Sequence, residues 1–283
     1  MHASVDASTS EMQQLDWWAL TAAVAGLAHL EGTPPLPCQD AAGAASSPRP
    51  MLAVADGAGS SSASDLGART IVSAMLRLFD TVEAQLAWLL DADAEPDPDT
   101  VRQFVAMLMR HAKGTLEDRA AEQRRPVRDL RCTLLLVVAG HSRLLWFKVG
   151  DGEIVLERAV EAGDGGSGLM PQLIVLGERG KGEFANQTCF VDDRLALGQV
   201  QYGCEAVVAL TGIAAMSDGA AEKMVSHDGE RVSGRLSHWL DDLRQGKLRQ
   251  RDLVRCFYSE TFSRGTSGDD RSIALLARDL ETL

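Results

Sequence analysis

Three short apolar runs in this 283-residue sequence end in the same way, with an aspartate followed by glycine. The three dipeptides are Asp56-Gly57, Asp151-Gly152 and Asp218-Gly219. Apolar runs of this length are typical of buried strands, and Asp-Gly is typical of the turns that end them. Because the ends of neighbouring strands lie close together in a sheet, a fold with this recurrence can bring several carboxylates to one edge.

Hydrophobic periodicity divides the rest of the chain into strands and helices. Strands are predicted at residues 17–26, 51–55, 133–139, 144–149, 154–156, 173–176, 189–191, 205–210, 213–216 and 272–277. Helices are predicted at residues 61–80, 82–90, 100–124, 231–244 and 248–262, with loops at 29–50, 91–99 and 163–168. The strands of 133–156 follow one another through short turns and predict a meander of hairpins. This mixture predicts an α+β fold in which helices pack on antiparallel sheets.

The sequence predicts a single domain preceded by a short tail. Residues 1–14 are polar and are predicted to be disordered, whereas residues 15–283 contain no internal repeat and no clear boundary. A chain of this length can bury a large core without disulfides. Its five cysteines are scattered and form no C-x-x-C pair, which is typical of reduced thiols. Without an N-terminal apolar segment, a cytoplasmic location is expected.

Charge narrows the class of partner. The formal net charge is −12 and the isoelectric point is near 5.0. Nucleic acids and anionic membranes both require clustered Lys and Arg, so neither is expected as a partner. No apolar run is long enough to cross a bilayer. The sequence therefore predicts no nucleic-acid binding and no membrane partner.

Two further acidic sites complete the set of candidate ligands. Asp40 lies in the first long loop, and Asp269-Asp270 precedes the last predicted strand. A single Asp-Gly is more often a turn than a catalytic feature, but the whole set favours a shared site. Converging carboxylates repel one another unless cations lie between them. Oxygen ligands without His or Cys select Mg²⁺ or Mn²⁺, and two such ions can activate a water molecule and neutralise a phosphoryl oxygen.

The order and surroundings of these acids resemble a known family, the metal-dependent protein phosphatases of the protein phosphatase 2C type. The matching segments are Cys38-Gln39-Asp40, Val54-Ala55-Asp56-Gly57-Ala58-Gly59, Thr133-Leu134-Leu135, Val149-Gly150-Asp151-Gly152, Met216-Ser217-Asp218-Gly219 and Gly268-Asp269-Asp270-Arg271-Ser272. They cover about residues 18–278. Gly-Asp-Gly and the stretch Glu183-Phe184-Ala185-Asn186-Gln187-Thr188 resemble a bacterial branch of the family.

The resemblance implies a sandwich of two antiparallel sheets flanked by helix pairs, with the metal site at one edge between the sheets. It implies that Asp56 bridges two Mn²⁺ or Mg²⁺ ions, that the Gly57 carbonyl binds one of them, and that Asp218 and Asp269 complete the first ion. Asp40 would reach the second ion through water.

The resemblance also implies the activity. Asp151 matches the acid linked in some relatives to a third ion, and Asp40, Asp56 and Asp218 match the catalytic acids. A hydroxide that bridges the ions would attack phosphorus directly. The implied substrate is a protein phosphorylated on Ser or Thr, as the target of a cognate Ser/Thr kinase.

Two positions depart from the family pattern. Many relatives have a phosphate-binding Arg five residues before the first acid, where this chain has Pro35. Candidates for a replacement are His29, Arg69 and Lys148, although a histidine after an apolar stretch is more often structural. The Glu that commonly precedes the first acid is Gln39 here, which leaves one negative charge fewer near the second ion.

Two alternative functions stay open at this point. The missing Arg favours a pseudophosphatase that only binds phosphoproteins, whereas the retained acids favour catalysis. A phosphoesterase for small molecules would use the same metal chemistry.

Of the adjacent acids Asp269 and Asp270, Asp269 is predicted to be the metal ligand. Neighbouring side chains on an extended backbone point to opposite faces, so only one of the two can point at the ion. When Asp269 is aligned with the metal-binding Asp of the family pattern, the hydroxyl residue Ser272 also falls at the position where the family has Thr.

Overall fold

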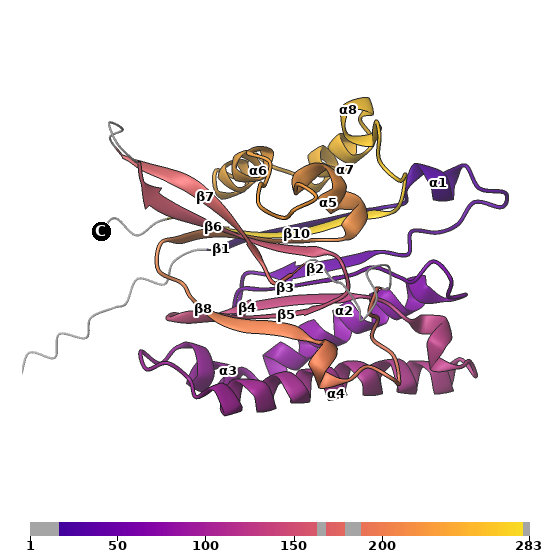
Figure 1. Ribbon diagram of the computed structural model, residues 1–283, viewed down its shortest axis with the longest axis horizontal. Helices are drawn as coiled ribbons and strands as arrows, with labels where there is room; N and C mark the ends of the chain where they lie inside the picture. The colour runs from indigo at the N-terminus through magenta and orange to yellow at the C-terminus, as the bar shows by residue number, and fades with distance from the viewer. Residues whose placement is uncertain (1–16, 163–167, 179–187, 280–283) are drawn as a thin grey trace, which may run out of the picture.

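The computed structural model describes residues 17–162, 168–178 and 188–279. Two five-stranded antiparallel sheets pack face to face, and helices cover the outer face of each sheet (Figure 1). The predicted α+β sandwich with flanking helices is therefore confirmed. The predicted tail at 1–14, most of the predicted loop at 163–168 and most of the stretch 183–188 lie outside the described residues.

The first sheet has the strand order β1-β10-β9-β6-β7. Its strands are β1 (Trp17–Val24), β6 (Glu153–Glu161), β7 (Leu169–Leu176), β9 (Leu210–Met216) and β10 (Arg271–Arg278). The second sheet has the order β2-β3-β4-β5-β8. Its strands are β2 (Ala41–Ala45), β3 (Met51–Ala55), β4 (Leu134–Ala139), β5 (Arg143–Val149) and β8 (Gln201–Ala206).

Two groups of helices enclose the sandwich. The second sheet is covered by α2 (Ser64–Thr81), α3 (Glu83–Leu90) and α4 (Pro98–Glu122), and the first by α5 (Asp218–Met224), α6 (Arg235–Arg244), α7 (Gln250–Phe257) and α8 (Glu260–Ser263) (Figure 1). The four-residue helix α1 (Leu27–Leu30) follows β1, and short 3₁₀ turns lie at Val127–Leu130 and Leu197–Gln199. No helix of the described residues is long and apolar enough to cross a membrane.

The alternation of side chains along the strands creates three apolar layers. Alternate residues of β3, such as Leu52 and Val54, pack between the sheets, while Met51 and Ala53 face the helices. This occurs because successive side chains of a strand point to opposite faces. Burial on both faces explains why β3 reads as an uninterrupted apolar run and ends abruptly at the first charged residue, Asp56.

One strand forms where the sequence predicts a loop. The prediction of a loop at 29–50 is wrong for β2, whose Ala-Ala-Gly-Ala-Ala composition has low strand propensity. The strand forms through pairing with β3, from Ala41 opposite Ala55 to Ala45 opposite Met51. Gly43 lies directly beneath α2, and a Cβ there would lie 2.7 Å from a methyl of Leu76. Small residues are thus required for packing against the helix.

The predicted meander of 133–156 is only half correct. β4 and β5 form a hairpin, but Gly150-Asp151-Gly152 carries the chain from one sheet to the other, where β6 pairs with β7 and β9. The buried side chains of Lys148 and Glu153 flank this crossing, with Nζ and Oε2 3.0 Å apart. Short turns do not reveal from sequence whether the next strand stays in the same sheet.

Other boundaries move for local reasons. The predicted strand at 205–210 is the end of β8 and the first residue of β9, which lie in different sheets, and Ala209 between them adopts a positive φ of 55° that a continuous strand does not allow. Residues 189–191 form only an isolated bridge between Val191 and Cys132. The predicted helix at 248–262 is divided at Ser259, whose hydroxyl accepts a hydrogen bond from the Phe262 N–H and begins α8.

Candidate metal centre

The strand pairings bring the predicted acids to one edge of the sandwich. Asp40 and Asp56 adjoin the paired residues Ala41 and Ala55 of β2 and β3. Asp218 begins α5 immediately after β9, and Asp269 precedes β10, which pairs with β9. Asp151 lies in the crossing before β6, whose first residue is opposite Met216 of β9. Five carboxylates from separate parts of the chain therefore meet at one end of the fold.

Electrostatic coupling shows that these carboxylates are mutual neighbours. Burial raises the pKa of Asp56 well above its ordinary value, and the charges of Asp40, Asp218 and Asp269 raise it further. Burial raises the pKa of Asp218 to about 6, with further contributions from the charges of Asp151 and Asp269. The carboxyl groups of Asp56 and Asp218 thus resist ionisation first because they are buried and then because other carboxylates surround them.

Asp40 is the most enclosed member of the group. Its side chain is 5% exposed, and burial raises its pKa to about 7. The hydroxyls of Ser217 and Ser272 lie near enough to favour its charged form. However, neither carboxylate oxygen has a hydrogen-bond partner of good geometry among the described residues. A buried carboxylate without a donor or a cation is costly and calls for a ligand.

Neighbouring backbone and hydroxyl groups fix the loops that carry the acids. The Asp56 N–H donates to Thr133 Oγ1 at 2.9 Å, and the Thr133 N–H donates to the Asp56 carbonyl at 2.8 Å. The Gly57 N–H donates to the Gln39 carbonyl at 3.2 Å, which joins the loops of Asp56 and Asp40. A Cβ at Gly57 would lie 2.7 Å from Ser64 Cβ, so only glycine allows this close approach.

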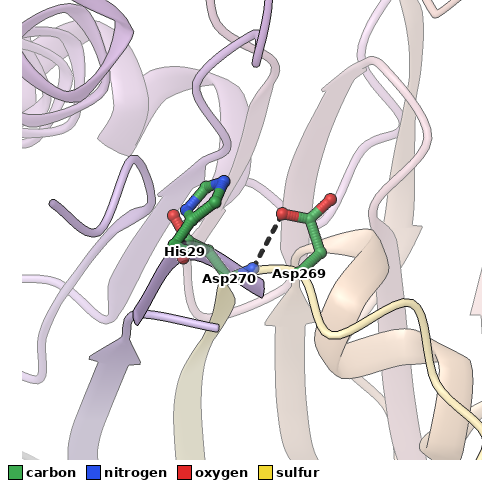
Figure 2. Close-up of side chains that lie close together, drawn as sticks. All are labelled: His29, Asp269 and Asp270. Carbon is green, nitrogen blue, oxygen red and sulfur yellow. Dashed lines mark hydrogen bonds and ion pairs between the residues drawn. The ribbon is translucent and has the colours of Figure 1, made fainter. Parts of the chain in front are cut away.

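The adjacent residues Asp269 and Asp270 point in different directions (Figure 2). The Asp270 carboxylate accepts hydrogen bonds from the N–H groups of Gly26, at 2.7 Å, and Gln39, at 2.5 Å. His29 Nδ1 lies 2.8 Å from Asp270 Oδ1. The Asp269 carboxylate accepts the Asp270 N–H at 2.8 Å and contributes to the raised pKa values of Asp56 and Asp218. Asp270 is therefore already engaged by protein donors, although its charge also raises the pKa of Asp40, while the charge of Asp269 acts on Asp56 and Asp218.

The loop that carries Asp269 is anchored by a buried arginine. Arg271 donates to the carbonyl of Phe257, to Ser263 Oγ at 3.0 Å and to Thr266 Oγ1 at 2.9 Å. Its guanidinium carbon lies 5.3 Å from the ring centroid of Phe262. These contacts tie α7, α8 and the following loop to the first residue of β10.

The three candidate replacements for the missing phosphate-binding Arg occupy different environments. Lys148 is fully buried in its ion pair with Glu153. Arg69 lies on α2 and pairs with Asp65 at 2.6 Å, in a groove of about 720 Å³ lined by residues of α2 and α4. His29 alone adjoins the acids, since its ring lies within 4.8 Å of both Asp269 and Asp270 ligand atoms.

Sequence reasoning missed several polar groups of the site. Thr188 Oγ1 donates to Asp151 Oδ2 at 2.6 Å. The Ser272 N–H donates to Ser217 Oγ at 3.0 Å, and both hydroxyl groups act on Asp40. Ser217 and Ser272 stand inside the quoted acidic motifs, but nothing in their spacing indicated that they face Asp40.

The arrangement fits divalent cations. Five carboxylates converge, their pKa values are raised where shifts are resolved, and no Lys, Arg or His of the described residues forms an ion pair with any of them. The donors are hard oxygens, which match Mg²⁺ or Mn²⁺ rather than softer metals. Cations bound here would remove the mutual repulsion that the chain itself leaves uncompensated.

Comparisons with known proteins place this geometry in a family. The family model described as "Protein phosphatase 2C" matches residues 26–256. A search of curated proteins returns no match.

Several solved structures with the same fold are bacterial proteins, and among them PstP and Stp1 are serine/threonine phosphatases. The catalytic domain of the serine/threonine phosphatase PstP in complex with two manganese ions has a TM-score of 0.59 and 16% identity, covering 94% of this chain and 99% of that one. Stp1 from Staphylococcus aureus has a TM-score of 0.55 and 11% identity, covering 94% and 96%. PppA from Pseudomonas aeruginosa has a TM-score of 0.54 and 14% identity, covering 93% and 98%.

Proposed function

This chain belongs to the protein phosphatase 2C family, and from that premise we propose that it is a metal-dependent phosphatase acting on phosphorylated Ser and Thr residues of proteins. The observation that supports this most strongly is the buried carboxylate of Asp40, which lacks a hydrogen-bond donor of good geometry and belongs to a group of acids that no Lys, Arg or His of the described residues pairs with. A module that bound phosphoproteins without metal ions would gain nothing from this arrangement, because the acids repel a phosphoryl group unless cations lie between them.

The acids divide the work of holding ions. Asp56, the Gly57 carbonyl, Asp218 and Asp269 would hold one ion, and Asp56 and Asp40 would hold a second. Asp151 is available for a third. When bound, divalent cations neutralise phosphoryl oxygens and lower the pKa of water. The chain itself contributes preorganised geometry, because Thr133 and Gln39 fix the backbone around Asp56 and Gly57.

The family and the fold leave the substrate class to experiment. PstP and Stp1 are serine/threonine phosphatases, and PstP was solved with two manganese ions, which supports Mn²⁺ or Mg²⁺ and a phosphoprotein here. All five cysteines are free thiols, which fits the predicted cytoplasmic location. The upstream partner would be a Ser/Thr kinase that phosphorylates the same protein.

Three substrates and three metal conditions test the proposal. The purified protein is assayed on a phosphoserine peptide, an aryl phosphate and a nucleoside monophosphate, with Mn²⁺, with Mg²⁺ or with excess chelator. We expect turnover of the peptide and the aryl phosphate that requires an added ion and disappears in chelator. Full turnover in chelator would refute the metal mechanism, and a preference for the nucleotide would indicate a small-molecule phosphoesterase.

The departure at Pro35 favours one competing function, a pseudophosphatase. Pro35 is exposed, and neither Lys148 nor Arg69 is available at the acids to replace the missing Arg. A pseudophosphatase would bind Mn²⁺ and a phosphopeptide but release no phosphate from any of the three substrates. Phosphate release above the chelator background therefore decides between the two functions.

A further inference from the structure

A protruding segment lies next to the acids and is closed at its base by one carboxylate. This segment, residues 26–39 between β1 and β2, is called the protrusion here. Asp270 accepts hydrogen bonds from the N–H groups of its two ends, Gly26 and Gln39. The Ala28 N–H donates to the Gly268 carbonyl at 3.0 Å. The protrusion is thus held to the loop of Asp269, and α1 lies at the end of the sandwich (Figure 1).

The outer surface of the protrusion is apolar and open to solvent. Leu27, Leu30 and Leu36 are 37%, 45% and 46% exposed. Leu27 and Leu30 are three residues apart and lie on one side of α1. The backbone of Leu36 lies beside α1, because its N–H donates to the His29 carbonyl at 3.0 Å. Residues 33–37, Thr-Pro-Pro-Leu-Pro, are all exposed, so the apolar surface continues along the loop.

Large exposed apolar side chains are few elsewhere in the described residues. Of the eight, three lie on the protrusion, and a fourth, Tyr258, donates its hydroxyl to the Ala25 carbonyl at 2.9 Å at the base. The other four are divided between α3, β7 and the turn before β9. A concentration of apolar surface beside a polar site is typical of a binding surface rather than of random exposure.

The protrusion lies close to the acids. His29 lies on α1 between Leu27 and Leu30, and its ring lies within 4.8 Å of ligand atoms of Asp269. An extended peptide advances about 3.3 Å per residue. A phosphorylated residue seated at the acids therefore places its next few neighbours within reach of the leucines.

The charges around the protrusion disfavour acidic residues next to the phosphorylated residue of a substrate. The protrusion contains no Lys or Arg, and its ionisable side chains besides the Cys38 thiol are His29 and Glu31. The acids beside it are negative. An acidic flanking sequence would gain no cation and would be repelled, whereas an apolar flank would remove leucine and proline surface from water.

From this juxtaposition we propose that the protrusion is a docking surface for apolar side chains that flank the phosphorylated residue of a protein substrate. The proposal rests on the proposed function, and it assigns to the protrusion a substrate contact that replaces a cationic clamp at Pro35. The energy of recognition then comes from the flanking residues, and a small phosphate ester receives none of it.

The test compares substrates that can and cannot reach the protrusion. The double variant Leu30→Ser/Leu36→Ser is assayed on a phosphoserine peptide with leucines flanking the phosphoserine, on a matched peptide with serines there, and on an aryl phosphate. The control is Trp88→Ser, which removes an apolar side chain that is 68% exposed on α3. Circular dichroism confirms that each variant is folded.

We expect the double variant to raise the KM for the leucine peptide about tenfold, because the contacts are lost only with that substrate. The KM values for the serine peptide and the aryl phosphate should stay unchanged, as should all values for Trp88→Ser. An unchanged KM for the leucine peptide would overturn the proposal. An equal loss on the aryl phosphate would also overturn it, because the leucines would then only support the site.

Two further readouts keep this result separate from the proposed function. If no substrate is hydrolysed in Mn²⁺, the proposed function fails, and binding of the labelled leucine peptide by fluorescence anisotropy still tests the docking surface. Loss of that binding in the double variant supports docking, and unchanged binding overturns it. Light scattering tests a second copy as the occupant. A dimer that becomes monomeric in the double variant would overturn the proposal.

Discussion

Buried acids occur in two regions of this molecule, and the two regions treat them differently. In the first sheet, Glu153 and Glu157 are paired with Lys148 and Arg244 at 3.0 and 2.7 Å. At the edge of the sandwich, Asp40 is almost equally buried but has neither a cation nor a hydrogen-bond donor of good geometry among the described residues. The same residue chemistry is thus compensated in one region and left uncompensated in the other.

The difference distinguishes buried acids whose ion pairs stabilise the fold from buried acids that are left free to bind metal ions. A buried ion pair is costly to break, because removal of one partner leaves the other without compensation. The acids at the edge are held in that uncompensated state by the fold itself. Their cost is tolerable if cations from outside complete the site, which is why the comparison supports a metal centre.

The largest expected effect is on the paired region. Lys148→Met should lower the free energy of unfolding by about 3–5 kcal/mol, because Glu153 loses its buried cation. Urea denaturation measures the change. The double variant Lys148→Met/Glu153→Leu is the control and should recover most of the loss. A loss below about 1 kcal/mol in the single variant would mean that the pair is not buried as described.

Removal of a charge in the unpaired region should act on catalysis instead. Asp56→Asn and Asp218→Asn should each lower turnover at least ~100-fold, because loss of an ion removes several kcal/mol of transition-state stabilisation. Both variants should stay folded, since one of several repelling charges is removed. Asp65→Asn, at the surface pair with Arg69, is the control and should keep wild-type rates. Near-normal turnover in either test variant would show that the site is misplaced.

The adjacent residues Asp269 and Asp270 offer the same comparison between an acid that is available to a metal ion and an acid that protein groups already bind. Asp269→Asn should weaken Mn²⁺ activation at least ~tenfold, because the ion loses a charged ligand. Asp270→Asn should leave that activation nearly unchanged but cost about 1–3 kcal/mol of stability, since one of the N–H groups of Gly26 and Gln39 loses its acceptor. Manganese titration of activity and urea denaturation measure the two effects. A larger activation defect in the Asp270 variant would reverse the assignment.

The smallest effect concerns pH and the metal-free protein. The pKa of Asp40 is raised to about 7, from an ordinary value of 3.8, so its charged form destabilises the fold. In chelator, Asp40→Asn should therefore be more stable than the wild type at pH 7.5. The gain should shrink as pH falls through 7 and vanish below the ordinary pKa of 3.8, where the acid is protonated in both the folded and the unfolded state. Thermal melts across this range check the sign, and a gain that grows at low pH would contradict it.

Most of the acids could be found from sequence because they stand where a predicted apolar strand ends or just before one begins, whereas Asp40 lies in a predicted loop and could be found only through the family resemblance. Asp56, Asp151 and Asp218 each end an apolar run, and although a single Asp-Gly is more often a turn, the recurrence of three favours a shared site. The acids converge because their strands pair with one another. That pairing could be expected from the family resemblance but not from hydrophobic periodicity. Asp218 shows the limit, since its Asp-Gly was read as a turn but begins α5.

The supporting groups could not be found in this way. Asp270 serves two backbone N–H groups from a segment more than 230 residues away in sequence. Ser217 and Ser272 face Asp40 only because β9 and β10 pair in one particular register. The buried pair of Lys148 and Glu153 depends on a crossing between sheets that short turns do not reveal. Each of these features depends on tertiary contacts that leave no local pattern.

Direct titration of Mn²⁺ into the metal-free protein tests the central claim, that the unpaired acids are a metal site. Calorimetry at pH 6.5 in buffers of different ionisation enthalpy should show saturable binding with release of protons, because the pKa values of Asp40 and Asp218, about 7 and about 6, lie near that pH. Asp56→Asn should lose most of this binding. Absence of binding, or binding that is unchanged in Asp56→Asn and releases no protons, would contradict the account.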